Sequence, residues 1–179
     1  MWDVLFVIAI ILLIRYLFGG SSQSAVVPAA GATMEILKKA TVVKRDRSSK
    51  GLADVLNECD VVAIYFSAHW CPPCRMFTPV LADVYKQLKN QGKKLEVVFV
   101  SSDKTEDAMF AYMEETHGDW YAIKYNDAAR SELGSHFGVR SIPTLIILKK
   151  DGTVISKDGR SEVQSKGTGA WELWTASAN

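Results

Sequence analysis

The chain carries two cysteines separated by two prolines, Cys71-Pro72-Pro73-Cys74, just after an unbroken apolar run over residues 61–66. A short apolar run of this kind is typical of a buried β-strand. Proline is tolerated in the first turn of a helix, because the N–H groups there have no partner within the helix. We therefore expect a buried strand, a tight turn and a helix that opens at the cysteine pair. No other stretch of the sequence limits the possible folds as strongly.

The spacing of the two thiols suits reversible disulfide chemistry. Residues three apart on a helix lie on neighbouring faces, so the sulfur atoms of Cys71 and Cys74 can close a small ring. Cys71 precedes the helix, where unpaired N–H groups and the positive end of the helix dipole favour an anion. The thiolate is such an anion and is the nucleophilic form of cysteine. Trp70 beside the pair strengthens the interpretation as a redox site.

Two other interpretations of the pair stay open. A structural zinc site needs a second ligand pair, but only Cys59 and the scattered histidines His69, His117 and His136 remain, without ligand spacing. The pair can also form a static structural disulfide. Cys59 itself is most simply explained as an inert, small apolar residue before the core strand.

Charge and cysteine content exclude some classes of protein. The formal net charge of +1 argues against nucleic acid as a main partner, because phosphate binding needs a concentrated basic surface. The three cysteines in 179 residues do not make a disulfide-stapled secreted scaffold.

Residues 2–18 form an apolar segment that we expect to be a retained transmembrane helix. Its length, about 25 Å as a helix, is short against a hydrocarbon core of about 30 Å. Its apolar side chains contribute about −4 to −7 kcal/mol on an insertion scale, against at most about +3 kcal/mol for Arg15. A cleaved signal peptide is the alternative, although Asp3 stands where positive charge is usual.

The charges that flank the segment predict its orientation. Asp3 precedes the unbroken apolar stretch of residues 4–14, and Arg15 follows it. These charges place the domain that follows on the cytoplasmic side of a single-pass membrane protein. A secreted or luminal domain is the expectation if the segment is cleaved.

The rest of the chain is expected to form a flexible linker over residues 19–33 and one domain over residues 34–179. Within 34–50 we expect a short edge strand and a turn at Ser48-Ser49. Strand and helix patterns then alternate, which indicates an α/β domain of three layers. The expected helices are 52–56, 72–90, a helix that ends near Gly118, and 127–137. A kink is expected at Pro79, and Ser101–Asp103 is expected to cap the helix that ends near Gly118. The expected strands are 61–66, 95–100, 120–125, and 144–148 paired with 153–156 in a hairpin.

Several motifs together resemble the nucleoredoxin and tryparedoxin branch of the thioredoxin superfamily, most closely the nucleoredoxin-like proteins. The resemblance covers roughly residues 31–174. The matching motifs are Tyr65–Arg75, Phe77-Thr78-Pro79, Val97–Asp103, Trp120, Ser141–Leu145, Gly159-Arg160 and Trp174.

The resemblance implies a thioredoxin fold that acts as a thiol-disulfide oxidoreductase. Cys71 would be the attacking thiol and Cys74 the resolving thiol. Trp70 and Ile142 would contact the substrate, together with Pro143, which the resemblance makes a cis-proline beside the disulfide. An ordinary trans proline at a strand start and a merely structural, exposed tryptophan remain the alternatives.

One position departs from ordinary thioredoxins. These have a buried aspartate six residues before the first cysteine, and this chain has Tyr65, as tryparedoxins do. Deprotonation of Cys74 must then use water or another group. His69 and Arg75 are candidates for tuning the thiolate, with a solvated loop histidine and an ordinary surface arginine as the simpler explanations.

The expected activity is reduction of protein disulfides by a monomer, with electrons from an external dithiol donor and with no metal or bound cofactor. The alternative is a membrane-tethered adaptor that binds a signalling partner according to the redox state of the cysteine pair. An oxidase or isomerase role is favoured if the domain is luminal.

Overall fold

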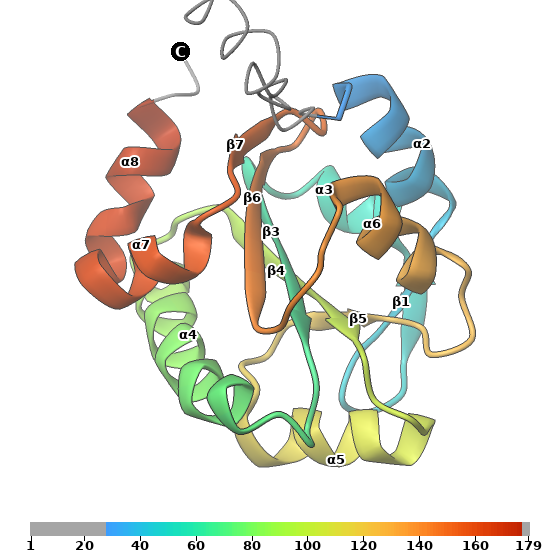
Figure 1. Cartoon of the computed structure of the whole chain (residues 1–179). Helices are drawn as coiled ribbons and strands as arrows, with labels where there is room; N and C mark the ends of the chain where they lie inside the picture. Colours follow the sequence, from blue (N-terminus) through green and yellow to red (C-terminus); the bar gives the residue numbers. More distant parts are fainter. Residues whose placement is uncertain (1–27, 177–179) are drawn as a thin grey trace, which may run out of the picture.

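The computed structural model describes residues 28–176, which fold around one mixed sheet of seven strands in the order β2-β1-β5-β4-β3-β6-β7 (Figure 1). The central strands β3, β4 and β5 are parallel to one another, and every other neighbouring pair is antiparallel. The strands are β1 (Thr41–Val43), β2 (Ser49–Gly51), β3 (Val61–Ser67), β4 (Leu95–Ser101), β5 (Tyr121–Ile123), β6 (Thr144–Lys149) and β7 (Val154–Ser156).

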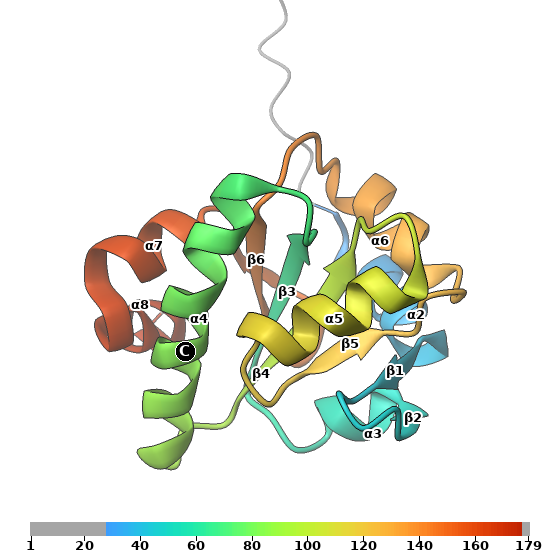
Figure 2. The ribbon, with the colours of Figure 1, turned by 90° about the horizontal axis from the view of Figure 1, so that it is seen from below.

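Helices cover both faces of the sheet, which gives the expected three layers (Figures 1 and 2). Side chains of α4, α5, α7 and α8 pack in the hydrophobic core on one face, and those of α2, α3 and α6 pack in the core on the other. The helices are α2 (Ala30–Lys39), α3 (Leu52–Leu56), α4 (Pro72–Asn90), α5 (Glu106–Thr116), α6 (Ala129–Phe137), α7 (Gly159–Lys166) and α8 (Ala170–Ala176), with a 3₁₀ turn at Gly167–Gly169.

Strand β3 lies in the interior of the sheet between β4 and β6, and all of its residues are buried. Val61, Ala63 and Tyr65 pack in the core beneath α4, whereas the alternate residues pack on the opposite face. This alternation explains the continuous apolar run, because a strand covered on both faces needs apolar side chains at every position. β3 and β4 end side by side, with Ser67 paired to Ser101, and the chain leaves β3 towards the cysteine pair.

Helix α4 begins at Pro72, as the two prolines predict, and contains Pro79 in its interior. Its buried residues recur at helical spacing and hold the helix against the sheet. Each large apolar side chain buried in this way contributes about 1.5–3 kcal/mol. The amino-terminal end of α4 is thereby fixed above the carboxyl-terminal end of β3.

The C-terminal helices α7 and α8 were not predicted from the sequence. α7 starts against β6 because Gly159 has no Cβ; an added Cβ would lie 2.9 Å from the carbonyl oxygen of Leu145. The indole Nε1 of Trp174 donates to Glu162 at 2.7 Å and ties the two helices together. α7 carries few apolar residues, of which Val163 is buried, so its helical periodicity is faint in the sequence.

Two boundaries expected from the sequence are wrong. Helix α2 begins at Ala30, inside the expected linker, because Thr33 and Leu37 are buried and the Thr33 hydroxyl lies 2.9 Å from His136 on α6. The helix also replaces the first part of the expected edge strand. Helix α5 is capped by Thr105, whose hydroxyl accepts from the N–H of Ala108, and not by Ser101–Asp103.

The turn expected at Ser48-Ser49 lies earlier, at Arg45-Asp46, because Ser49 already pairs with Val43 as the first residue of β2. The other elements expected within residues 28–176 are present, with ends that differ by a few residues. The expected transmembrane helix and most of the expected linker lie outside the described residues. Between residues 28 and 176, no helix combines the length and the apolar character that a membrane span requires.

Candidate active site

The two cysteines lie at the amino-terminal end of α4 and form a disulfide, with their Cα atoms 5.2 Å apart. Cys71 is the N-cap residue, and Pro72 and Pro73 follow it without N–H groups of their own. The first N–H group of the helix therefore belongs to Cys74, and it donates to Cys71 Sγ at 3.3 Å. This donor and the positive end of the helix dipole both stabilise negative charge on Cys71 Sγ when the disulfide is open.

The two cysteines differ in burial. Cys71 keeps 3% of its surface exposed and Cys74 is fully buried. Cys71 is therefore the less buried residue of the pair.

The segment before β6 faces the cysteine pair. The peptide bond between Ile142 and Pro143 is cis, as predicted. The carbonyl oxygen of Ile142 lies 3.8 Å from Cys71 Sγ, and the Ile142 side chain packs against both cysteines. Ile142 and Pro143 are therefore neighbours of the reactive sulfur, although 71 positions separate Ile142 from Cys71.

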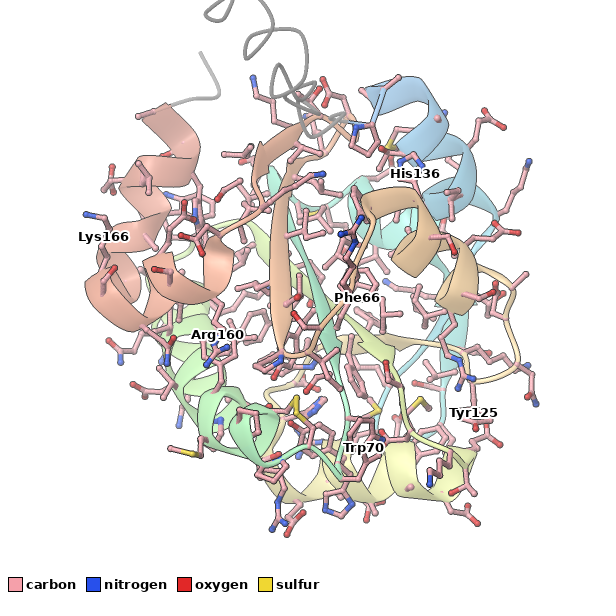
Figure 3. The ribbon with its side chains drawn as sticks, viewed as in Figure 1. Phe66, Trp70, Tyr125, His136, Arg160 and Lys166 are labelled. Atoms are coloured by element: carbon pink, nitrogen blue, oxygen red, sulfur yellow. A yellow bond between two sulfur atoms is a disulfide. The ribbon has the colours of Figure 1, made fainter. Side chains whose placement is uncertain are left out.

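Trp70 stands beside the disulfide with 60% of its surface exposed (Figure 3). Its indole Nε1 donates to the carbonyl oxygen of Ser102 at 3.2 Å, which fixes the direction of the ring. The ring forms part of the wall of an open groove of about 510 Å³. The fixed ring leaves an apolar, aromatic surface exposed beside Cys71.

His69 and Arg75 share one carboxylate, that of Glu115 on α5. Glu115 lies 2.6 Å from His69 Nε2 and 4.0 Å from an Arg75 nitrogen. The imidazole also stacks on Tyr112, with ring centroids 5.4 Å apart. Because Glu115 offsets the positive charge of Arg75 and also binds the His69 ring, the effect of Arg75 on Cys71 is weaker than the sequence alone suggests.

Tyr65 is fully buried beneath α4, and its hydroxyl lies 2.7 Å from Thr78 Oγ1. Thr78 Oγ1 in turn donates to the carbonyl oxygen of Cys74 at 2.9 Å. Burial raises the pKa of Tyr65 well above its ordinary value, so the phenol stays neutral at physiological pH. Tyr65 therefore does not substitute for a carboxylate as a base.

The sequence did not single out Thr78, Tyr112 or Glu115 as site residues. The Tyr112 hydroxyl lies beside Thr78 Oγ1 and 3.1 Å from Ser67 Oγ. Asp103 was placed at a helix cap, but its carboxylate accepts from the N–H of His69 at 2.8 Å. These contacts join residues more than 30 positions apart, and no local pattern in the sequence signals them.

The third cysteine lies away from this site. Cys59 is buried in the core on the opposite face of the sheet, as expected of a small apolar residue, and its thiol donates to the carbonyl oxygen of Val55 at 3.6 Å. Burial raises the pKa of the Cys59 thiol to about 11, which keeps it protonated and unreactive.

A mixed sheet between two helical layers, with a Cys-x-x-Cys disulfide opening a helix and a cis-proline facing it, defines a protein with the thioredoxin fold. Residues 58–154 match the thioredoxin-like family. The chain belongs to this family, in the branch that contains the nucleoredoxins and tryparedoxins.

Individual relatives support this placement. Nucleoredoxin from Bos taurus is 48% identical over 103 residues, which is 57% of this chain and 23% of that protein. Thioredoxin related protein 16 from Carcinoscorpius rotundicauda is 48% identical, with a TM-score of 0.69 over 77% of this chain and 96% of its own. Tryparedoxin from Trypanosoma brucei is 35% identical, with a TM-score of 0.66 over 76% of this chain and 92% of its own. This chain thus matches about a quarter of the length of nucleoredoxin and nearly all of the two smaller proteins.

Proposed function

We propose that this chain is a thiol-disulfide oxidoreductase that reduces disulfides in proteins. The observation that carries the proposal is the position of Cys71 Sγ: it caps α4, accepts the N–H of Cys74 at 3.3 Å and belongs to the less buried residue of the pair. A helix N-terminus lowers the pKa of a cysteine thiol. If the pKa falls from about 8.5 to about 7, the thiolate fraction at pH 7 rises from about 3% to about 50%.

The reaction proceeds in two exchanges. The Cys71 thiolate attacks one sulfur of the substrate disulfide, a Cys71–substrate bond forms, and the other substrate sulfur leaves as a thiolate. Cys74 then loses its proton and attacks Cys71 Sγ, which closes the Cys71–Cys74 disulfide and releases the second substrate thiol. Two electrons pass to the substrate, and a separate dithiol donor restores the reduced pair.

The surroundings of the pair support a polypeptide substrate. Trp70, which precedes Cys71 in the chain, and Ile142, whose carbonyl oxygen lies 3.8 Å from Cys71 Sγ, both line the open groove. An extended chain lying there brings its cystine to Cys71, while Cys74 stays covered until the second exchange.

Turnover of insulin tests this function. The full chain in neutral detergent, with dithiothreitol as donor, should reduce insulin catalytically. The Cys71→Ser variant should be inactive, because a serine hydroxyl is not ionised at neutral pH. Full turnover by Cys71→Ser would contradict the proposal.

A redox-sensing adaptor is the second candidate. The Carcinoscorpius protein has been described with a role in regulating the activity of the transcription factor NF-kB. In this chain, Trp70, Met76 and Val80 leave apolar side chains exposed near the start of α4, where a partner protein can bind. An adaptor should bind its partner with different affinity in the oxidised and reduced states and should turn over insulin poorly.

We further propose that residues 2–18 anchor the protein in a membrane with the cysteine pair on the cytoplasmic side. The apolar content of this segment and the positions of Asp3 and Arg15 support this arrangement. A reducing compartment suits a reductase, because it maintains the cysteine pair as thiols.

A further inference from the structure

The groove beside the disulfide carries positive charge without acidic residues to balance it. Its lining includes Arg130 and Arg140 and no aspartate or glutamate. Among residues 28–176, neither arginine takes part in an ion pair. By contrast, Arg75, on the other side of Cys71, has Glu115 at 4.0 Å.

Arg130 is held in a fixed position. Its guanidinium lies over the ring of Tyr125, with Cζ 4.0 Å from the centroid, and the Tyr125 hydroxyl donates to the carbonyl oxygen of Asp103 at 3.2 Å. The Asp103 carboxylate accepts from the N–H of His69, next to Trp70. Figure 3 shows Tyr125 and Trp70 towards the same end of the sheet. A continuous series of contacts therefore links Arg130 to the loop that carries the cysteine pair.

One donor of Arg130 lacks a partner. Its Nη1 atom is buried and makes no hydrogen bond to any described residue. Most buried polar groups in proteins are hydrogen-bonded, and an unpaired charged donor costs stability. Arg130 also lines the groove, and a carboxylate that binds there can accept hydrogen bonds from the part of the guanidinium that faces the groove.

We propose that Arg130 and Arg140 make this groove selective for an acidic residue, aspartate or glutamate, close to the cystine of a substrate protein. The inference rests on the proposed reductase function and adds its substrate class. Ile142 connects the two parts of the site, because it lines the groove and its carbonyl oxygen lies 3.8 Å from Cys71 Sγ. A substrate chain that extends from Cys71 past Ile142 into the groove meets the wall that Arg130 and Arg140 line.

Paired cystine peptides test the selectivity. The peptides are identical except that glutamate replaces glutamine at one position, one to four residues to either side of the cysteine. With the full chain in neutral detergent, we expect kcat/KM to be about tenfold higher for glutamate at a position on one side only. Because the attraction is electrostatic, the preference should shrink as ionic strength rises from about 0.05 M to about 0.5 M.

Matched variants locate the effect. Arg130→Gln and Arg140→Gln should each reduce the preference for glutamate several-fold while the rate with neutral hydroxyethyl disulfide stays unchanged. Arg140 is exposed in a loop, so its variant should fold even if loss of the Tyr125 contact destabilises Arg130→Gln. Lys166→Gln is the control: it removes one positive charge from an exposed residue at the end of α7, which lies far from Trp70 in Figure 3. This variant should keep the full preference for glutamate.

Failure of the proposed selectivity can be distinguished from failure of the proposed reductase function. Equal kcat/KM for glutamate and glutamine peptides at every position, with normal reduction of hydroxyethyl disulfide, would overturn the selectivity alone. The same conclusion follows if Lys166→Gln abolishes the preference as completely as the groove variants do. Absence of reduction with every substrate would overturn the reductase function and the selectivity together.

Discussion

Thr78 Oγ1 donates a hydrogen bond to the carbonyl oxygen of Cys74, at 2.9 Å, one helical turn after the second cysteine of the disulfide. A threonine hydroxyl has one proton, so the neighbouring hydroxyls of Tyr65 and Tyr112 must both donate to Thr78 Oγ1. The Ser67 hydroxyl then donates to Tyr112. These directions follow from counting protons, and they make Thr78 the centre of a buried polar cluster.

Replacing Thr78 by valine should destabilise the fold. The change keeps the shape of the side chain but leaves the hydroxyls of Tyr65 and Tyr112 without the acceptor that they share, which costs about 2–3 kcal/mol of unfolding free energy. Urea denaturation measures the loss, and Thr78→Ser, which keeps the hydroxyl, is the control with a smaller effect. A loss below about 0.5 kcal/mol in Thr78→Val would show that the cluster is not held as described.

Tyr65→Phe tests whether this residue takes part in proton transfer. Since burial holds the pKa of Tyr65 far above physiological pH, the phenol is neutral and is not a base in the second exchange. We expect a loss of about 1 kcal/mol in stability. Insulin turnover should stay within about twofold of wild type, because no step of the exchange uses the phenol. A large fall in turnover with a shifted pH–rate profile would assign Tyr65 a direct role.

His117 should make the fold sensitive to acid. Burial lowers the pKa of His117 to about 3, whereas an unfolded histidine takes up its proton near 6.5. Between these pH values the unfolded state binds more protons, so the contribution of His117 to stability falls as the pH drops. Relative to pH 8, this loss reaches about 2 kcal/mol at pH 5.

The variant that isolates this effect is His117→Asn. The asparagine oxygen can accept the hydrogen bond that Trp120 Nε1 donates to His117 Nδ1 at 3.0 Å. The unfolding free energy of wild type minus that of the variant should decrease by about 2 kcal/mol between pH 8 and pH 5. A difference that is constant across this range would mean that His117 is not buried in its neutral form.

Membrane anchoring through residues 2–18 predicts that the full chain sediments with membranes and resists alkaline carbonate extraction. A shortened chain that starts at residue 28, before α2, should remain in the soluble fraction and should keep its activity on small disulfides. The start must precede Ala30, because Thr33 and Leu37 are buried. A mature N-terminus near Thr33 would contradict the anchor, and protection of the domain from protease in sealed cytoplasmic-side-out vesicles would contradict its orientation.

Local patterns predicted the central part of the fold well. The apolar run of β3 and the helical spacing of α4 each carry their own signal, so the position of the cysteine pair followed from the sequence. Helix α2 was not predicted, because its first residues, Ala30 and Gly31, are small and resemble a linker. Its helical form also depends on packing against α6, which no local pattern shows.

The candidate site was predictable only in part. Cys71, Cys74 and Pro143 stand in recognisable motifs, whereas the roles of the other residues depend on contacts between distant segments. His69 and Glu115 are 46 positions apart, and Tyr65 and Thr78 are on different elements. The same holds for Arg130, whose unpartnered Nη1 becomes evident only once α6 is placed beside the loop with Trp70.

The most direct test of the central claim is to identify the sulfur atom that attacks the substrate. In Cys74→Ser the second exchange is blocked, so the first intermediate should accumulate as a mixed disulfide with insulin. Mass spectrometry of the non-reduced, digested adduct should place the substrate cysteine on Cys71 and leave Cys59 as a free thiol. An adduct on Cys59, or no adduct while Cys71→Ser still reduces insulin, would contradict the assignment of Cys71 as the nucleophile.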